Sequence, residues 1–146
     1  MQQQRMAVIA EAVSFVGTPY HHQGRIKGVG VDCGYLLAEV YAKACGMGRM
    51  EFGFYPEDWM MHSAAERYMT EVQARCVEVE QPEPGDIALF QWGRAFSHGA
   101  IVIEWPKVVH AIGNTKRQTG GVEYADAFQP PLKDRTVRFF SPWRAE

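Results

Sequence analysis

The chain has 146 residues, a formal net charge of −2 and a hydrophobic content of 47%. This length predicts a single domain spanning residues 1–146, because a chain of this size buries one substantial core and rarely two. Its 15 basic and 17 acidic residues are spread along the sequence, so it lacks the basic stripe that a nucleic-acid-binding protein needs. We therefore expect no nucleic-acid partner.

Membrane insertion and secretion are not expected either. No stretch approaches the roughly twenty apolar residues of a membrane-spanning helix. The N-terminal segment carries a lone Arg5 and reaches Glu11 before any long apolar run, so it lacks the core of a secretory signal. We expect the chain to be made in a cytoplasm without a signal peptide.

The first predicted element is a helix that Gly17-Thr18-Pro19 ends. Its expected buried face has three- and four-residue spacing and consists of Met6, Ile9, Val13 and Val16. The next run, residues 20–31, is rich in glycine and lacks periodicity, which predicts an exposed loop.

A second helix is predicted directly after this loop. Asp32 occupies its N-cap position and Gly46 the position of a C-terminal cap. Its apolar stripe consists of Leu36, Leu37, Val40, Tyr41 and Ala44. A third helix is expected to start at Pro56-Glu57-Asp58, with a face formed by Met61, Ala65, Tyr68 and Val72.

The second half of the chain changes to short runs rich in β-forming residues. The predicted strands are residues 86–92, 98–105, 107–112, 122–124 and 136–140. Helices followed by strands predict an α+β domain in which the helices pack on one side of an antiparallel sheet.

Cys33 differs from the other two cysteines in its surroundings. Cys45 and Cys76 form neither a C-x-x-C pair nor an even disulfide framework with it, and we expect both to be buried free thiols. Cys33 falls in the first turn of the second helix, where unpaired backbone N–H groups and the helix dipole favour a thiolate nucleophile. The alternative is that Cys33 is an inert core residue.

His98 and His110 are the candidate partners of this thiol. His98 opens one predicted strand, His110 lies on the next, and Trp105-Pro106-Lys107 forms the turn between them. Antiparallel pairing would bring the two imidazoles together, so that His98 acts as a general base and His110 orients it. Each histidine taken alone is better explained as a structural side chain, and only the set with Cys33 indicates a triad.

Five short motifs, taken in order, resemble the NlpC/P60 family over close to the whole chain. They are Gly17-Thr18-Pro19-Tyr20, Val31-Asp32-Cys33-Gly34, Pro84-Gly85-Asp86-Ile87, Ser97-His98-Gly99-Ala100-Ile101-Val102 and Val109-His110. The resemblance implies a papain-like fold and hydrolysis of peptide bonds in bacterial peptidoglycan, typically between D-γ-glutamyl and a diamino acid. It matches Cys33, His98 and His110 to the family's nucleophile, base and third polar position, and it implies no cofactor.

The same resemblance suggests roles for three further residues. Tyr20 matches a tyrosine beside the nucleophile that steadies the oxyanion or the substrate, although packing under the helix explains an aromatic ring equally well. Asp32 matches a position that meets the amine of the stem peptide, and an N-cap role is the alternative. Gly34 and Tyr35 replace the usual serine and glycine, which alters the expected substrate pocket at Gly34.

The closest subgroup by resemblance consists of phage cell-wall peptidases associated with tail tips. The shared features are the Gly-Val-Gly-Val-Asp-Cys-Gly run, the segment from Tyr55-Pro56 to Trp59, and the Ser97 to Val102 motif. This implies a virion tail component, made in the bacterial cytoplasm, with tail-tip proteins as partners. Two alternatives stay open: a structural tail-tip or hub protein with weak or no catalysis, and a thiol amidase or acyltransferase acting on a small substrate.

Two other groups of residues are less informative. His21 and His22 have no cysteine or carboxylate at ligand spacing, so we expect no metal site. Trp59, Trp92 and Trp105 could line a glycan-binding cleft or pack in the core.

Overall fold

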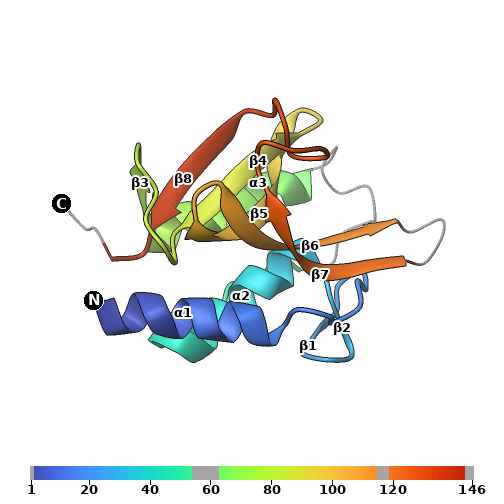
Figure 1. Cartoon of the computed structure of the whole chain (residues 1–146), viewed down its shortest axis with the longest axis horizontal. Helices are drawn as coiled ribbons and strands as arrows, with labels where there is room; N and C mark the ends of the chain where they lie inside the picture. The colour runs from blue at the N-terminus through green and yellow to red at the C-terminus, as the bar shows by residue number, and fades with distance from the viewer. Residues whose placement is uncertain (1, 54–62, 115–118, 144–146) are drawn as a thin grey trace.

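The computed structural model describes residues 2–53, 63–114 and 119–143, which form three helices and eight strands (Figure 1). The helices are α1 (Gln2–Ser14), α2 (Cys33–Cys45) and α3 (Ser63–Arg75). The strands are β1 (Arg25–Ile26), β2 (Gly30–Val31), β3 (Val77–Val79), β4 (Ile87–Trp92), β5 (Ala95–Glu104), β6 (Lys107–Asn114), β7 (Thr119–Asp126) and β8 (Val137–Ser141). The predicted start of the third helix at Pro56-Glu57-Asp58, and Met61, lie outside the described residues.

An antiparallel sheet with the strand order β3-β8-β4-β5-β6-β7 forms the centre of the fold. All three helices contribute to one buried cluster on one face of this sheet, through residues such as Val8, Leu37 and Tyr68. Figure 1 shows α1 and α2 lying together beneath the sheet. The predicted α+β architecture, with helices on one side of an antiparallel sheet, is confirmed.

A second, smaller cluster covers the opposite face. Residues of β4 alternate between the clusters, because Ile87 and Leu89 face the helices while Ala88 and Phe90 face away. Leu132, from the segment between β7 and β8, joins the second cluster. The sheet is therefore buried on both faces, by helices on one side and by an irregular segment on the other.

Both ends of α2 match the sequence prediction. An oxygen of the Asp32 carboxylate accepts a hydrogen bond from the backbone N–H of Tyr35 at 2.9 Å, as an N-cap does. Gly46 adopts a left-handed conformation with φ of 65°, and its N–H donates to the carbonyl oxygen of Tyr41. The helix that carries Cys33 therefore begins and ends at positions that local capping chemistry determines.

The predicted face of the first helix is wrong by one residue. Met6 is 63% exposed and Val16 is 38% exposed, whereas Arg5, Val8, Ala12 and Phe15 are buried. Arg5 turns inward because its guanidinium forms an ion pair with Asp86 at 2.9 Å and stacks on Trp143. A charged residue at the centre of the buried face does not contribute to a pattern based on apolar residues.

Four smaller expectations also need correction. The loop predicted at residues 20–31 contains a short hairpin of β1 and β2, and β3 was not predicted. The other strands were found with changed ends. Cys45 and Cys76 are half-buried rather than buried.

Candidate active site

Cys33 is the first residue of α2, and its side chain is 4% exposed. Its Sγ atom lies 3.6 Å from the backbone carbonyl oxygen of Ser97, the residue before His98. Burial raises the pKa of the thiol to about 12, although the backbone N–H groups of Gly99, Cys33 and Gly34 act in the opposite direction. The N–H groups at the start of the helix therefore favour the thiolate, as expected, but burial outweighs them and the resting sulfur is a neutral thiol.

The two imidazoles lie together on the β5–β6 hairpin, as predicted. The Nε2 atom of His98 lies 2.8 Å from the Nδ1 atom of His110. Ala100 pairs with His110, and His98 lies two residues before Ala100 on β5, so its side chain is on the same face of the sheet as that of His110. His98 is 7% exposed and His110 is fully buried.

Burial also determines the charge of this pair. It lowers the pKa of His98 well below its ordinary value, and the neighbouring His110 and Arg135 lower it further. Burial lowers the pKa of His110 as well, while Glu123 opposes that shift. Both imidazoles are therefore neutral at neutral pH, which is the form of His98 that can accept a proton.

A β-bulge lies beside His98 and links it to the thiol. Phe90 on β4 pairs with His98, but Gln91 pairs with Phe96, so Ser97 is an extra residue on β5. The carbonyl oxygen of this extra residue is the group that contacts Cys33. The bulge thus places the backbone of one residue against the nucleophile and the side chain of the next residue against His110.

Trp92 packs against the His98 ring on the side of the sheet away from the helices. The two ring centroids are 4.7 Å apart, and the guanidinium carbon of Arg135 lies 3.4 Å from the Trp92 ring centroid. Arg135 also donates hydrogen bonds to the carbonyl oxygens of Pro131 and Gln91. No sequence pattern indicates this stack, because Arg135 lies in a segment without periodicity.

Glu123 is a second neighbour that the sequence analysis missed. It lies on β7 directly opposite His110, and its Oε2 atom is 3.5 Å from the His110 Nε2 atom. The predicted strand at residues 122–124 includes Glu123, but only the register with the strand of His110 shows which residue stands opposite.

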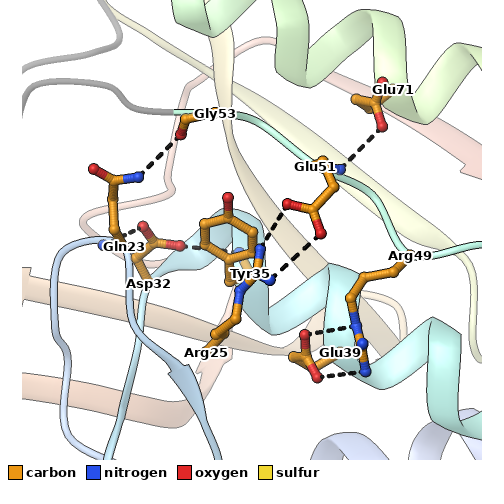
Figure 2. Close-up of polar contacts among 9 residues, drawn as sticks. All are labelled: Gln23, Arg25, Asp32, Tyr35, Glu39, Arg49, Glu51, Gly53 and Glu71. Atoms are coloured by element: carbon orange, nitrogen blue, oxygen red, sulfur yellow. Dashed lines mark hydrogen bonds and ion pairs between the residues drawn. The ribbon is translucent and has the colours of Figure 1, made fainter.

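Asp32 and Gly34 lie beside Cys33 and have structural contacts of their own. The second carboxylate oxygen of Asp32 accepts a hydrogen bond from the backbone N–H of Gln23 at 2.9 Å (Figure 2). A Cβ atom added at Gly34 would lie 3.0 Å from the Phe52 ring, so this ring occupies the space of a side chain. The N-cap role of Asp32 is present, and substrate binding by either residue stays a prediction.

A group of polar contacts holds residues 49–53 beside the start of α2 (Figure 2). The Arg25 guanidinium stacks on the Tyr35 ring at 4.1 Å and pairs with the Glu51 carboxylate at 2.9 Å. The Gln23 side chain donates to the Gly53 carbonyl oxygen, and the Glu51 N–H donates to a Glu71 carboxylate oxygen on α3. These contacts join the β1–β2 hairpin, α2 and α3 around Cys33.

Tyr20 lies between α1 and the β1–β2 hairpin and is half-buried. Its ring packs against Gly113 on β6, where an added Cβ atom would overlap the ring. Its backbone N–H donates to the Gly120 carbonyl oxygen at 3.2 Å. The ring therefore packs on a strand of the sheet, and a role for the hydroxyl beside the nucleophile stays a prediction.

The other residues singled out in the sequence are His21, His22, Trp105 and Trp59. The His21 Nδ1 atom lies 2.9 Å from the His22 carbonyl oxygen, and the described residues contain no group of three or more potential metal ligands. Trp105 packs on Phe90 and Phe139 in the second cluster. Trp59 lies outside the described residues.

Comparison with known families matches residues 17–140 to the NlpC/P60 family. The chain belongs to the NlpC/P60 family. Members of this family are typically cysteine peptidases that act as peptidoglycan hydrolases. The match includes Cys33, His98 and His110, and it extends over α2, α3 and all the strands except the last residue of β8.

Solved structures of NlpC/P60 domains share the fold. The NlpC/p60 domain of the peptidoglycan hydrolase SagA is 23% identical, with a TM-score of 0.61 over 92% of this chain and 96% of that chain. A protein similar to lipoproteins of the NLP/P60 family from Staphylococcus aureus is 21% identical, with a TM-score of 0.64 over 94% of this chain and 41% of that chain. The P60 domain of the M. avium subspecies paratuberculosis antigen MAP1204 is 19% identical, with a TM-score of 0.65 over 99% of this chain and 98% of that chain.

Two further searches, one of curated proteins and one for membrane-spanning helices, have negative results. A search of curated protein sequences found no match. Within the described part of this NlpC/P60 chain, no helix is both long enough and apolar enough to cross a membrane.

Proposed function

We propose that this chain is a cysteine endopeptidase that hydrolyses peptide bonds in the stem peptides of bacterial peptidoglycan. One observation carries the proposal: Cys33 at the start of α2 contacts the bulge of β5, and the next residue of that bulge is His98, hydrogen-bonded to His110. Membership of the NlpC/P60 family supports the choice of peptidoglycan as substrate.

In the proposed reaction, His98 takes the proton of the Cys33 thiol. The His98 Nε2 atom is bonded to His110, so the Nδ1 atom is the one available to accept this proton. The thiol turns from the Ser97 carbonyl oxygen toward the imidazole, and the resulting thiolate attacks the peptide carbonyl. A thioester forms, the amine leaves with the proton from His98, and water then releases the acyl group.

The start of α2 supplies the groups that stabilise the charge in this reaction. Backbone N–H groups at Cys33 and Gly34 lower the pKa of the sulfur, so they favour negative charge at this position. Because the resting thiol and imidazole are both neutral, the ion pair forms only as substrate is attacked.

The test is incubation of purified peptidoglycan with the wild-type protein, Cys33→Ala, Cys45→Ala and Cys76→Ala, with the released muropeptides measured by mass spectrometry. We expect products from the wild type and from both control variants, and none from Cys33→Ala. The masses of the products would identify the bond that is cut. Normal cleavage by Cys33→Ala would overturn the proposal.

We also propose, on the sequence resemblance alone, that the chain is a component of a phage tail and reaches the wall from outside the cell. The expected result is detection of its peptides by mass spectrometry in purified phage particles from cells that carry its coding sequence. Particles that lack it while the cell lysate contains it would contradict this location.

A further inference from the structure

We infer that Glu123 is a positioning residue that fixes which nitrogen of His110, and through it of His98, carries the proton; the inference rests on the proposed peptidase function. Glu123 stands opposite His110 in the register of β6 and β7. It does not reach the thiol or a substrate carbonyl through any described contact. Its effect passes through two imidazoles.

The inference starts from the buried nitrogen of His110. The Nε2 atom is buried and has no hydrogen-bond partner within the usual distance among the described residues. A Glu123 carboxylate oxygen lies 3.5 Å away, and the Glu123 side chain is 55% exposed, so it is free to move closer. Contacts of this kind are often long in an enzyme without substrate and shorten during the reaction.

The Glu123 carboxylate determines which ring nitrogens of His110 and His98 carry a proton. An ionised carboxylate only accepts hydrogen bonds, so it favours the form of His110 with hydrogen on Nε2. His110 Nδ1 is then an acceptor and must receive its hydrogen bond from the Nε2–H of His98, 2.8 Å away. This leaves the Nδ1 atom of His98 without a proton, which is the state that a general base needs.

Without Glu123, the opposite arrangement of protons on His110 and His98 becomes similar in free energy. His110 could carry its proton on Nδ1 and donate to His98 Nε2, which would place the His98 proton on Nδ1. That form of His98 cannot accept the thiol proton. Leaving the Nε2–H of His110 unpaired in a buried position is unfavourable, so the wrong form would be populated.

Charge provides a second effect of the same residue. Besides the two imidazoles themselves, the charged groups that act on the pair are Glu123 on β7, which acts on His110, and Arg135, which acts on His98. Arg135 and burial disfavour the imidazolium that forms when His98 takes the proton, whereas Glu123 raises the pKa of His110. Because Glu123 is more than half exposed, solvent screens this effect and we expect it to be modest.

The first test is NMR of the histidine side chains, which reports the protonated nitrogen from ¹⁵N shifts and needs no substrate. In the wild type at neutral pH we expect hydrogen on Nε2 of both His98 and His110. Glu123→Ala should give a mixture of forms at His110, while Glu123→Gln should restore the wild-type form because its carbonyl oxygen still accepts. A proton on Nδ1 of His110 in the wild type, or unchanged forms in Glu123→Ala, would overturn the inference.

The second test is kinetic. We expect Glu123→Ala to lower kcat by roughly tenfold with KM unchanged, and to move the acidic limb of the pH profile to lower pH. Glu104→Gln is the control, because it removes the same charge from an exposed position at the end of β5. Equal effects of the two variants would contradict a positioning role. A wild-type protein that cleaves no peptidoglycan would overturn the proposed function, while the NMR result would still decide the inference.

Discussion

The thiol and the imidazoles of the candidate site are held in place by different kinds of interaction. Cys33 lies on the helix face, where an N-cap, a helix start and a dense apolar cluster fix it within a few residues of sequence. His98 and His110 lie on neighbouring strands, where strand register and a bulge position them. Local chemistry determines one half of the site, and long-range pairing determines the other.

Because different interactions position the thiol and the imidazoles, a mutation can disturb one group without disturbing the other. Damage to the cap of α2 should reduce stability first, because the helix is also the main support of the apolar core. Damage to the imidazole pair should reduce activity first, because a smaller apolar cluster than that of α2 packs beside it.

The largest expected effect comes from the imidazole itself. His98→Asn keeps a hydrogen-bonding side chain but removes the base, and we expect peptidoglycan cleavage to fall by about 10²–10⁴-fold. His21→Asn, at an exposed loop histidine, is the matched control and should cleave normally. Muropeptide release measured over time distinguishes the variants, and a fully active His98→Asn would remove His98 from the mechanism.

The second-largest expected effect is on the free energy of unfolding and comes from the N-cap of α2. Asp32→Ala removes the acceptor for the Tyr35 and Gln23 N–H groups, so we expect the free energy of unfolding to fall by about 1–2 kcal/mol. Asp32→Asn keeps one acceptor oxygen and should lose less. Urea unfolding checks both variants, and equal stability of Asp32→Ala and wild type would show that the cap does not support the helix.

The smallest effect tests the stack on the imidazole side. Arg135 lowers the pKa of His98, so removing its charge raises that pKa. We expect Arg135→Gln to move the acidic limb of the pH profile to higher pH, opposite to Glu123→Ala. Arg138→Gln, which removes a similar cation over Phe96 and Phe140, is the control and should leave the limb in place. A shift to lower pH in Arg135→Gln would show that the charge of Arg135 does not act on His98.

The same division explains how much could be predicted from the sequence. The caps and stripe of α2 are local signals, and the structure matches them at Asp32 and Gly46. The meeting of His98 and His110 was predictable because one short hairpin joins their strands. The buried face of α1 was not, since Arg5 is buried only because Asp86, far away in the sequence, pairs with it.

The neighbours of the imidazoles were beyond sequence reasoning for a related reason. Glu123 becomes meaningful only through the register of β6 and β7, and Trp92 only through the packing of Arg135. Such contacts combine residues from separate strands and an irregular segment. A single sequence holds no periodic signal for them.

The contact between Gly34 and Phe52 limits how this chain can diverge or be redesigned. Phe52 is held edge-on between Tyr35 and Tyr68, with centroids 5.2 and 5.1 Å away, so its ring has little room to yield. The serine that is usual in the family after the cysteine would press its Cβ atom against this ring. A side chain at position 34 therefore requires the Phe52 ring to shift by a few tenths of an ångström, so the residue at position 52 limits which side chain position 34 can hold.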